Sequence, residues 1–129
     1  MAYNILVVDD SSITRNIMAR TIRMCGVDVG EIYFAENGQQ GIEQLGKIWP
    51  DIIFCDINMP VMNGVEFVKE LRAMDEWKDL AVVIVSTEGS KTRMEELEAH
   101  GIRGYIRKPF TAEQVAEMIN KVLGEGTHA

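Results

Sequence analysis

The sequence predicts an α/β fold in which a five-stranded parallel sheet carries helices on both faces. Short, uninterrupted apolar runs alternate along the chain with stretches of helical periodicity. Strands that are buried on both faces, as parallel strands are, give such runs, and the right-handed crossovers between them place helices on both sides. A length of 129 residues suits one domain with a single sheet.

Capping and turn residues delimit the predicted elements. Ser11-Ser12 and Thr111 offer N-cap oxygens, and Trp49-Pro50 ends a helical pattern because proline restricts the residue before it. Trp77, after the third helix, is expected to be half buried over an apolar surface. Strands are expected at 5–8, 32–35, 52–55, 81–85 and 105–106. Helices are expected at 13–24, 38–48, 64–74, 91–100 and 112–123.

Composition narrows the class of protein. The net charge of -7 argues against nucleic-acid binding, which needs clustered Lys and Arg, and suits a cation or a basic protein partner. Cys25 and Cys55 lie in apolar surroundings and no signal peptide is evident, so we expect reduced thiols and a cytoplasmic location. The sequence has no apolar run of bilayer length, so membrane insertion is not expected.

Polar side chains that can bind ligands or take part in catalysis occur where the predicted strands end. The carboxyl ends of parallel strands meet at one edge of a sheet, and ligands of such folds bind beyond that edge. This edge is expected to collect Asp9, Asp10, Asp56, Ser86, Thr87 and Lys108.

Three converging carboxylates predict a magnesium site and phosphoryl transfer. Their mutual repulsion is relieved by a divalent cation, and a site with few hard oxygen ligands favours Mg²⁺. A cation, a lysine and a hydroxyl together neutralise phosphoryl oxygens. The sequence has no glycine-rich nucleotide loop. A carboxylate is then the available nucleophile, and Asp56 would form an acyl phosphate.

Four motifs stand at these strand ends: Val7-Val8-Asp9-Asp10, Asp56-Ile57-Asn58-Met59-Pro60 with Asn63-Gly64, Val85-Ser86 and Lys108-Pro109-Phe110. Together they resemble the receiver domains of response regulators, and most closely the single-domain chemotaxis type. The resemblance runs along the whole chain and implies a flavodoxin-like sheet of order 2-1-3-4-5, with a receiver domain over 1–124 and a short tail over 125–129.

The resemblance implies a role for each site residue. Asp56 accepts the phosphoryl group, Asp9 and Asp10 join it in holding Mg²⁺, and the backbone carbonyl of Asn58 completes the protein ligands. Lys108 pairs with a phosphoryl oxygen, and its bond to Pro109 is expected to be cis.

The switch residues follow from the same resemblance. Ser86 is expected to be the switch hydroxyl and Tyr105 the aromatic side chain that moves inward with it. Thr87 departs from the family pattern, which has a small residue there, and it leaves two adjacent hydroxyls as candidates. Asn58 and Glu88 are polar residues expected to favour rapid hydrolysis of the acyl phosphate, whereas the methyl group of Thr87 would hinder water.

The implied partners are proteins. A histidine kinase would supply the phosphoryl group, and the output of this monomer would be protein contact, with the flagellar motor switch as the expected target. The partner face is expected to include Tyr105, Met118 and Lys121.

Three other interpretations remain open on the sequence. One is a phosphorelay or adaptor role outside chemotaxis, and another is a degenerate receiver that acts without phosphorylation. The third is a phosphatase of the haloacid-dehalogenase type, which also uses an aspartyl nucleophile. That family needs a second aspartate two residues after the nucleophile, where this chain has Asn58.

Overall fold

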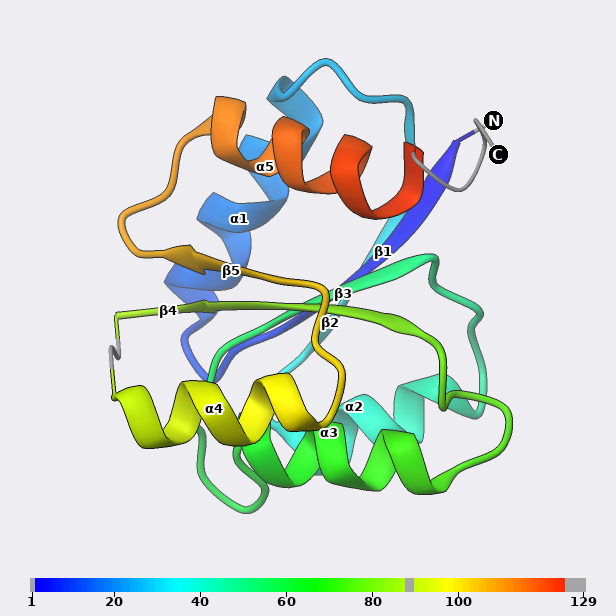
Figure 1. Cartoon of the computed structure of the whole chain (residues 1–129). Helices are drawn as coiled ribbons and strands as arrows, with labels where there is room; N and C mark the ends of the chain where they lie inside the picture. The colour runs from blue at the N-terminus through cyan, green and yellow to red at the C-terminus, as the bar shows by residue number, and fades with distance from the viewer. Residues whose placement is uncertain (1, 88–89, 125–129) are drawn as a thin grey trace.

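The computed structural model describes residues 2–87 and 90–124, which alternate strand and helix (Figure 1). The strands are β1 (Tyr3–Val8), β2 (Val29–Ala35), β3 (Ile52–Cys55), β4 (Ala81–Ser86) and β5 (Gly104–Arg107). The helices are α1 (Ser12–Met24), α2 (Gly38–Leu45), α3 (Gly64–Ala73), α4 (Lys91–Ala99) and α5 (Ala112–Ile119), followed by a π-helical turn, η1 (Asn120–Gly124). The predicted tail at 125–129 lies outside the described residues.

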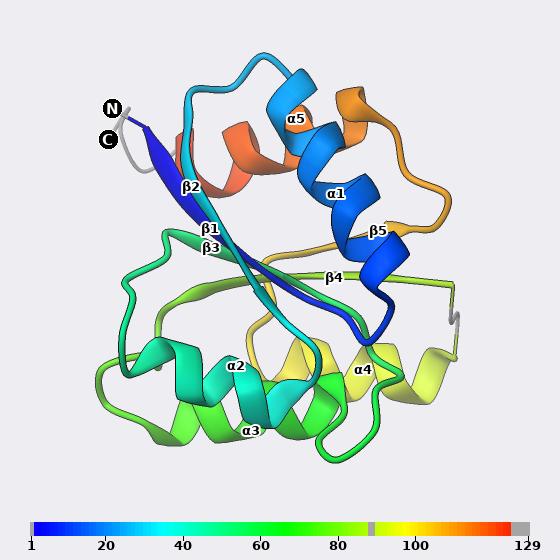
Figure 2. The same cartoon turned by 180° about the vertical axis from the view of Figure 1, so that it is seen from behind.

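The five strands form one parallel sheet in the order β2-β1-β3-β4-β5, which confirms the predicted fold. Helices α1 and α5 cover one face, and α2, α3 and α4 cover the other (Figures 1 and 2). No described helix is long and apolar enough to span a membrane.

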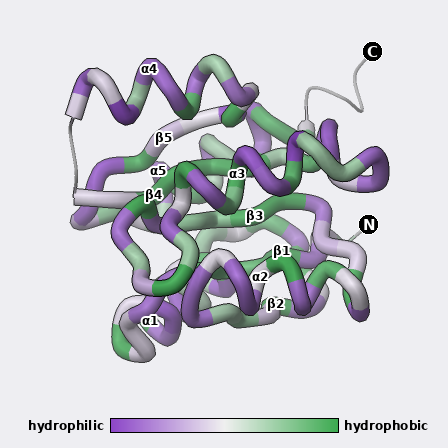
Figure 3. Tube along the Cα trace, turned by 90° about the horizontal axis from the view of Figure 1, so that it is seen from below, coloured by the Kyte–Doolittle hydropathy of each residue, from purple (hydrophilic) through white to green (hydrophobic). Residues whose placement is uncertain are grey.

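Each face of the sheet has its own apolar core because successive strand residues point to opposite sides. In β3, Ile52 and Phe54 pack with α1 and α5, whereas Ile53 and Cys55 pack on the side of α3 and α4. All four side chains of β3 are buried, and hydropathy colouring shows apolar residues along β1 and β3 (Figure 3). The uninterrupted apolar runs in the sequence reflect this double burial.

Two sequence predictions near the tryptophans are wrong. Helix α2 ends at Leu45, with Gly46 as its C-cap, and does not continue to Ile48. Trp77 is only 4% exposed and belongs to the core. It is buried because the α3–β4 loop makes consecutive turns, through the hydrogen bonds Trp77 N to Met74 O (3.0 Å) and Leu80 N to Trp77 O (3.1 Å). Trp49, 69% exposed, packs on its ring with a centroid separation of 4.6 Å.

The loop from β3 into α3 depends on a glycine. Gly64 donates its amide hydrogen to the Ile57 carbonyl at 2.8 Å. A Cβ atom at position 64 would collide with the carbonyl oxygen of Asp56. The start of α3 therefore packs directly on the backbone that carries Asp56, and the Asn63–Glu66 capping box fixes this end of the helix.

Val61, within this loop, has a conformation that valine disfavours. Its φ angle is 67°, and the hydrogen bond from Met62 N to Pro60 O (2.7 Å) closes a γ-turn around it. A β-branched residue in this region of backbone space is strained. The side chain is 80% exposed, so it gains little from packing there.

Replacing Val61 with Asn is expected to raise the free energy of unfolding by about 1 kcal/mol, because Asn adopts a positive φ at a smaller cost than a β-branched residue does. Urea denaturation measures the change. Val61→Thr keeps the branched Cβ and is the matched control, which should show no gain. If the Asn and Thr variants had equal free energies of unfolding, the expected gain could not come from relief of backbone strain at position 61.

Candidate functional site

Strand register brings the predicted site residues together at one edge of the sheet. Val8 of β1 pairs with Cys55 of β3, so the residues that follow them, Asp9 and Asp56, lie side by side. The hydrogen bonds Asp9 N to Ala35 O and Asp56 N to Val8 O, both 3.0 Å, extend the backbone pairing to these two residues. On the other side of β3, Ser86 pairs with Arg107, which places Lys108 at the same edge.

Lys108 connects the two buried carboxylates. Its Nζ lies 2.9 Å from Asp9 Oδ2 and 3.3 Å from Asp56 Oδ2. The other oxygens accept from backbone amides: Asp9 Oδ1 from Ser11 N at 2.9 Å, and Asp56 Oδ1 from Ile57 N at 2.7 Å. The three charged side chains are between 6% and 18% exposed. Both carboxylates are thus held in fixed orientations.

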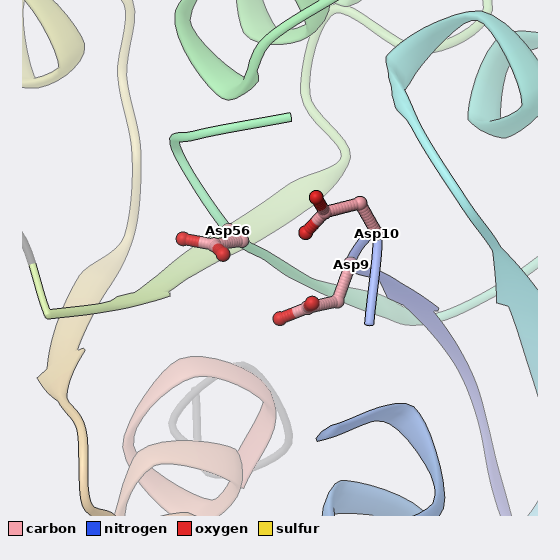
Figure 4. Close-up of side chains that lie close together, drawn as sticks. All are labelled: Asp9, Asp10 and Asp56. Atoms are coloured by element: carbon pink, nitrogen blue, oxygen red, sulfur yellow. The ribbon is translucent and has the colours of Figure 1, made fainter. Parts of the chain in front are cut away.

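Asp10 completes an acidic group at this edge. One oxygen from each of Asp9, Asp10 and Asp56 lies within 4.8 Å of the others, and Figure 4 shows the three side chains close together. Asp9 is buried, whereas Asp10 is exposed, so the group opens to solvent. Three converging carboxylate oxygens with an open side fit Mg²⁺, which takes oxygen ligands and retains several waters.

The electrostatics of the site keep Lys108 charged and Cys55 neutral. Burial lowers the pKa of Lys108, but the hydrogen bond to Asp9 and the charges of Asp56 and Asp9 more than offset it, so the pKa is raised. Burial raises the pKa of the Cys55 thiol well above its usual value, and the charges of Asp56 and Asp9 add to this. Cys55 donates to the Asp56 carbonyl at 3.1 Å, and it is a neutral core thiol at neutral pH.

The Ser86 carbonyl joins three predicted residues. It accepts from the amide of Lys108 at 3.0 Å and from the hydroxyl of Tyr105 at 3.2 Å. Ser86 is 1% exposed at the end of β4, whereas Thr87 follows the strand and is exposed. The two adjacent hydroxyls therefore differ in environment, and Ser86 is the one enclosed at the sheet edge.

The other predicted residues lie around this centre. Asn58 is exposed in the β3–α3 loop, two residues after Asp56, and Glu88 lies outside the described residues. The predicted cis bond between Lys108 and Pro109 is confirmed. Tyr105, Met118 and Lys121 line one cavity of about 260 Å³ between β5 and α5, so these three residues are neighbours in the fold.

The sequence interpretation missed Arg15. Its Nη1 donates to the Asp9 carbonyl at 2.7 Å, and its Nη2 lies 3.9 Å from Glu36 Oε1. The side chain is 13% exposed, so it ties the start of α1 to the backbone between the two acids. The sequence offered one signal for this role: Arg15 lies in the first turn of the helix that follows the acid pair Asp9-Asp10.

Comparison with known proteins identifies the family. The family model described as the response regulator receiver domain matches residues 5–120. The chain belongs to this family. This match confirms the resemblance seen in the motifs. Receiver domains are phosphorylation switches of two-component signalling systems.

Relatives of this receiver domain carry chemotaxis names. A chemotaxis protein CheY homolog from Campylobacter jejuni is 38% identical over 124 residues, covering 95% of this chain and 94% of that protein. Chemotaxis protein CheY1 from Helicobacter pylori is 36% identical, covering 93% and 96%. The structure of Vibrio cholerae chemotaxis protein CheY4 superposes with a TM-score of 0.85 at 32% identity, covering 95% of this chain and all of that one.

Lys108→Met is expected to lower the free energy of unfolding of this receiver domain by about 1–2 kcal/mol at neutral pH in metal-free buffer, because two carboxylates lose their shared cation. The folded pKa of Lys108 is raised. Its stabilisation is therefore complete below the unfolded lysine pKa of about 10.4 and is lost as pH rises through the folded value.

Urea unfolding from neutral to alkaline pH tests this expectation, and the difference between wild type and Lys108→Met should shrink at the alkaline end. Lys121→Met, which removes an exposed lysine, is the control and should show no such pH dependence. A constant difference across the range would mean that the variant acts through packing.

Proposed function

We propose that Asp56 accepts a phosphoryl group from a histidine kinase and that the acyl phosphate changes the affinity of this domain for a protein target. The observation that supports this most is the pair of contacts from Lys108 to Asp56 and Asp9. In the transfer, an oxygen of Asp56 forms a bond to phosphorus while the phosphorus–nitrogen bond of the phosphohistidine breaks. The imidazole leaves with that electron pair.

Asp9, Asp10 and Asp56 are the side chains that would hold Mg²⁺, with the backbone carbonyl of Asn58 as a fourth protein ligand. The convergence of the three carboxylates supports this assignment. A bound ion would supply positive charge to the phosphoryl oxygens. Lys108 would supply a second positive charge, because its ammonium already contacts Asp56 Oδ2.

Asp10→Asn is expected to weaken Mg²⁺ binding at least about tenfold while leaving the fold intact, because Asp10 is exposed and contributes charge rather than packing. Isothermal titration calorimetry measures the affinity, and circular dichroism confirms folding. Asp51→Asn, at the start of β3 on the opposite edge, is the matched control. Equal Mg²⁺ affinity in wild type and Asp10→Asn would show that Asp10 is not a ligand.

Ser86 and Tyr105 are the residues through which the phosphoryl group would act. The Ser86 hydroxyl sits at the buried end of β4, and the Ser86 carbonyl already accepts from Tyr105. A phosphoryl group that accepts a hydrogen bond from the Ser86 hydroxyl would shift the populations of the Tyr105 conformations. The surface that Tyr105 shares with Met118 and Lys121 would change with them. Thr87 is exposed and adjacent, so it would flank the path of water.

Chemotaxis is the pathway we propose, because the relatives with these names align along nearly the whole chain. The proposed target is the flagellar motor switch. We propose that this domain acts in the cytoplasm as a monomer. The polar pair Asn58 and Glu88 favours attack of water on the acyl phosphate, which suits a short-lived signal.

The function is tested by incubating the domain with a radiolabelled phosphohistidine donor and Mg²⁺. Wild type should acquire an acid-stable, alkali-labile label, as an acyl phosphate does, whereas Asp56→Asn should acquire none. Lys108→Met should be labelled but should transmit no change to a motor-switch peptide. Continuous turnover of a small phosphate ester in the absence of a kinase would indicate a phosphatase instead.

A further inference from the structure

A pocket of about 420 Å³ lies between the α3–β4 and α4–β5 loops. Both loops precede a strand, so the pocket is at the amino ends of β4 and β5, whereas Asp56 follows the carboxyl end of β3. It is therefore separate from the carboxylate site. The residues that line it include Arg72, Lys78, Asp79, His100, Gly101 and Arg103.

Arg72 holds the two loops in place. Its guanidinium donates to the carbonyls of His100 (2.8 Å) and Gly101 (3.1 Å), which follow α4. It also donates to the carbonyls of Trp77 (3.2 Å) and Leu80 (2.9 Å) in the α3–β4 loop. The carbonyls at the end of α4 form the negative end of the helix dipole, and Arg72 compensates that charge. Arg72 therefore offsets the negative end of the α4 dipole beside the pocket, and Lys78 and Arg103 supply donors for an anion.

Lys78 and Arg103 give the pocket, together with Arg72, three basic side chains against the single carboxylate of Asp79. Across the described residues, neither side chain lies within ion-pair distance of an acid, and Arg103 donates instead to the backbone carbonyl of Asp79 at 3.2 Å. Burial lowers the pKa of Arg72, and the charge of Arg103 lowers it further against the opposing charge of Asp79. This local excess of positive charge occurs in a chain with a net charge of -7.

We propose that this pocket binds a small polyvalent anion of the phosphate or polycarboxylate class. Arginine and lysine donors match the oxygens of such groups, and several cations around one cavity favour a multiply charged ligand over a monovalent one. The volume is in the range of small-molecule sites. The proposal does not depend on phosphorylation of Asp56.

Bound anion would link the end of α4 to the start of β5. The amide of Arg103 donates to Val82 O at 2.9 Å, and Tyr105 follows two residues later. The ligand is therefore expected to stabilise the fold by mass action and to raise its melting temperature.

Intrinsic fluorescence supplies a direct readout, because both tryptophans of the chain lie at this edge of the sheet. The carbonyl of Trp77 accepts from Arg72, and Lys78 is the next residue. Metal-free protein is titrated with pyrophosphate and, separately, with citrate, while KCl keeps the ionic strength constant. A saturable change in emission and a higher melting temperature are expected.

Matched variants locate the binding. Arg103→Gln and Lys78→Gln should each weaken the apparent affinity about tenfold, as loss of a charge-assisted hydrogen bond does. Lys47→Gln removes the same charge just after α2, outside the pocket, and should change the affinity less than about twofold. Asp56→Asn should bind the anion normally, and the two pocket variants should be phosphorylated normally, which separates this proposal from the function of Asp56.

The outcomes distinguish the sources of the anion. Saturation by pyrophosphate alone assigns the pocket to phosphate compounds, and saturation by citrate alone assigns it to polycarboxylates. The proposal is overturned if neither anion gives saturation up to about 10 mM, if KCl alone reproduces the signal, or if the two pocket variants bind as tightly as Lys47→Gln.

Discussion

The ion pairs of Lys108 with Asp9 and Asp56 are the interaction on which the functional edge of this molecule depends. Two carboxylates that are almost buried lie on adjacent strands, and without a shared cation their repulsion would destabilise the sheet at this point. Each carboxylate uses its second oxygen to accept a backbone amide, so neither can turn away. The result is an acid at position 56 with a fixed orientation and a lysine already in contact with it.

The same edge of the sheet is connected by hydrogen bonds to Tyr105. The Ser86 carbonyl accepts from the Lys108 amide and from the Tyr105 hydroxyl, so one oxygen connects the β5–α5 loop, the end of β4 and the aromatic side chain of β5. In the proposed switch, a change of charge at Asp56 would act on Lys108, which contacts Asp56 and whose amide donates to the Ser86 carbonyl. The Tyr105 hydroxyl donates to the same carbonyl, so this short chain of contacts would be the physical basis of the switch.

The two edges of the sheet differ in charge. The carboxyl edge concentrates three acids, whereas the amino edge has a basic pocket in which Arg72 fastens two loops through four carbonyls. Both tryptophans lie at the amino edge. Tyr105, by contrast, is an aromatic residue that hydrogen-bonds to the Ser86 carbonyl at the carboxyl edge.

Local sequence patterns were enough to predict the fold class, the existence of five strands, most helix starts and the identity of the acids and lysine at the strand ends, although β2 begins at Val29 and not at Ile32. These follow from local patterns: apolar runs, capping residues such as Thr111, and the residue at which each run stops. They misplaced the end of α2 and the burial of Trp77, because loop turns and tertiary contacts decide both. Only the tertiary structure revealed that Lys108 contacts Asp9 across 99 positions and that Arg72 reaches His100 across 28. Periodicity encodes which face of its own element a residue occupies, but a contact between elements depends on strand order, register and side-chain reach, which no local pattern contains.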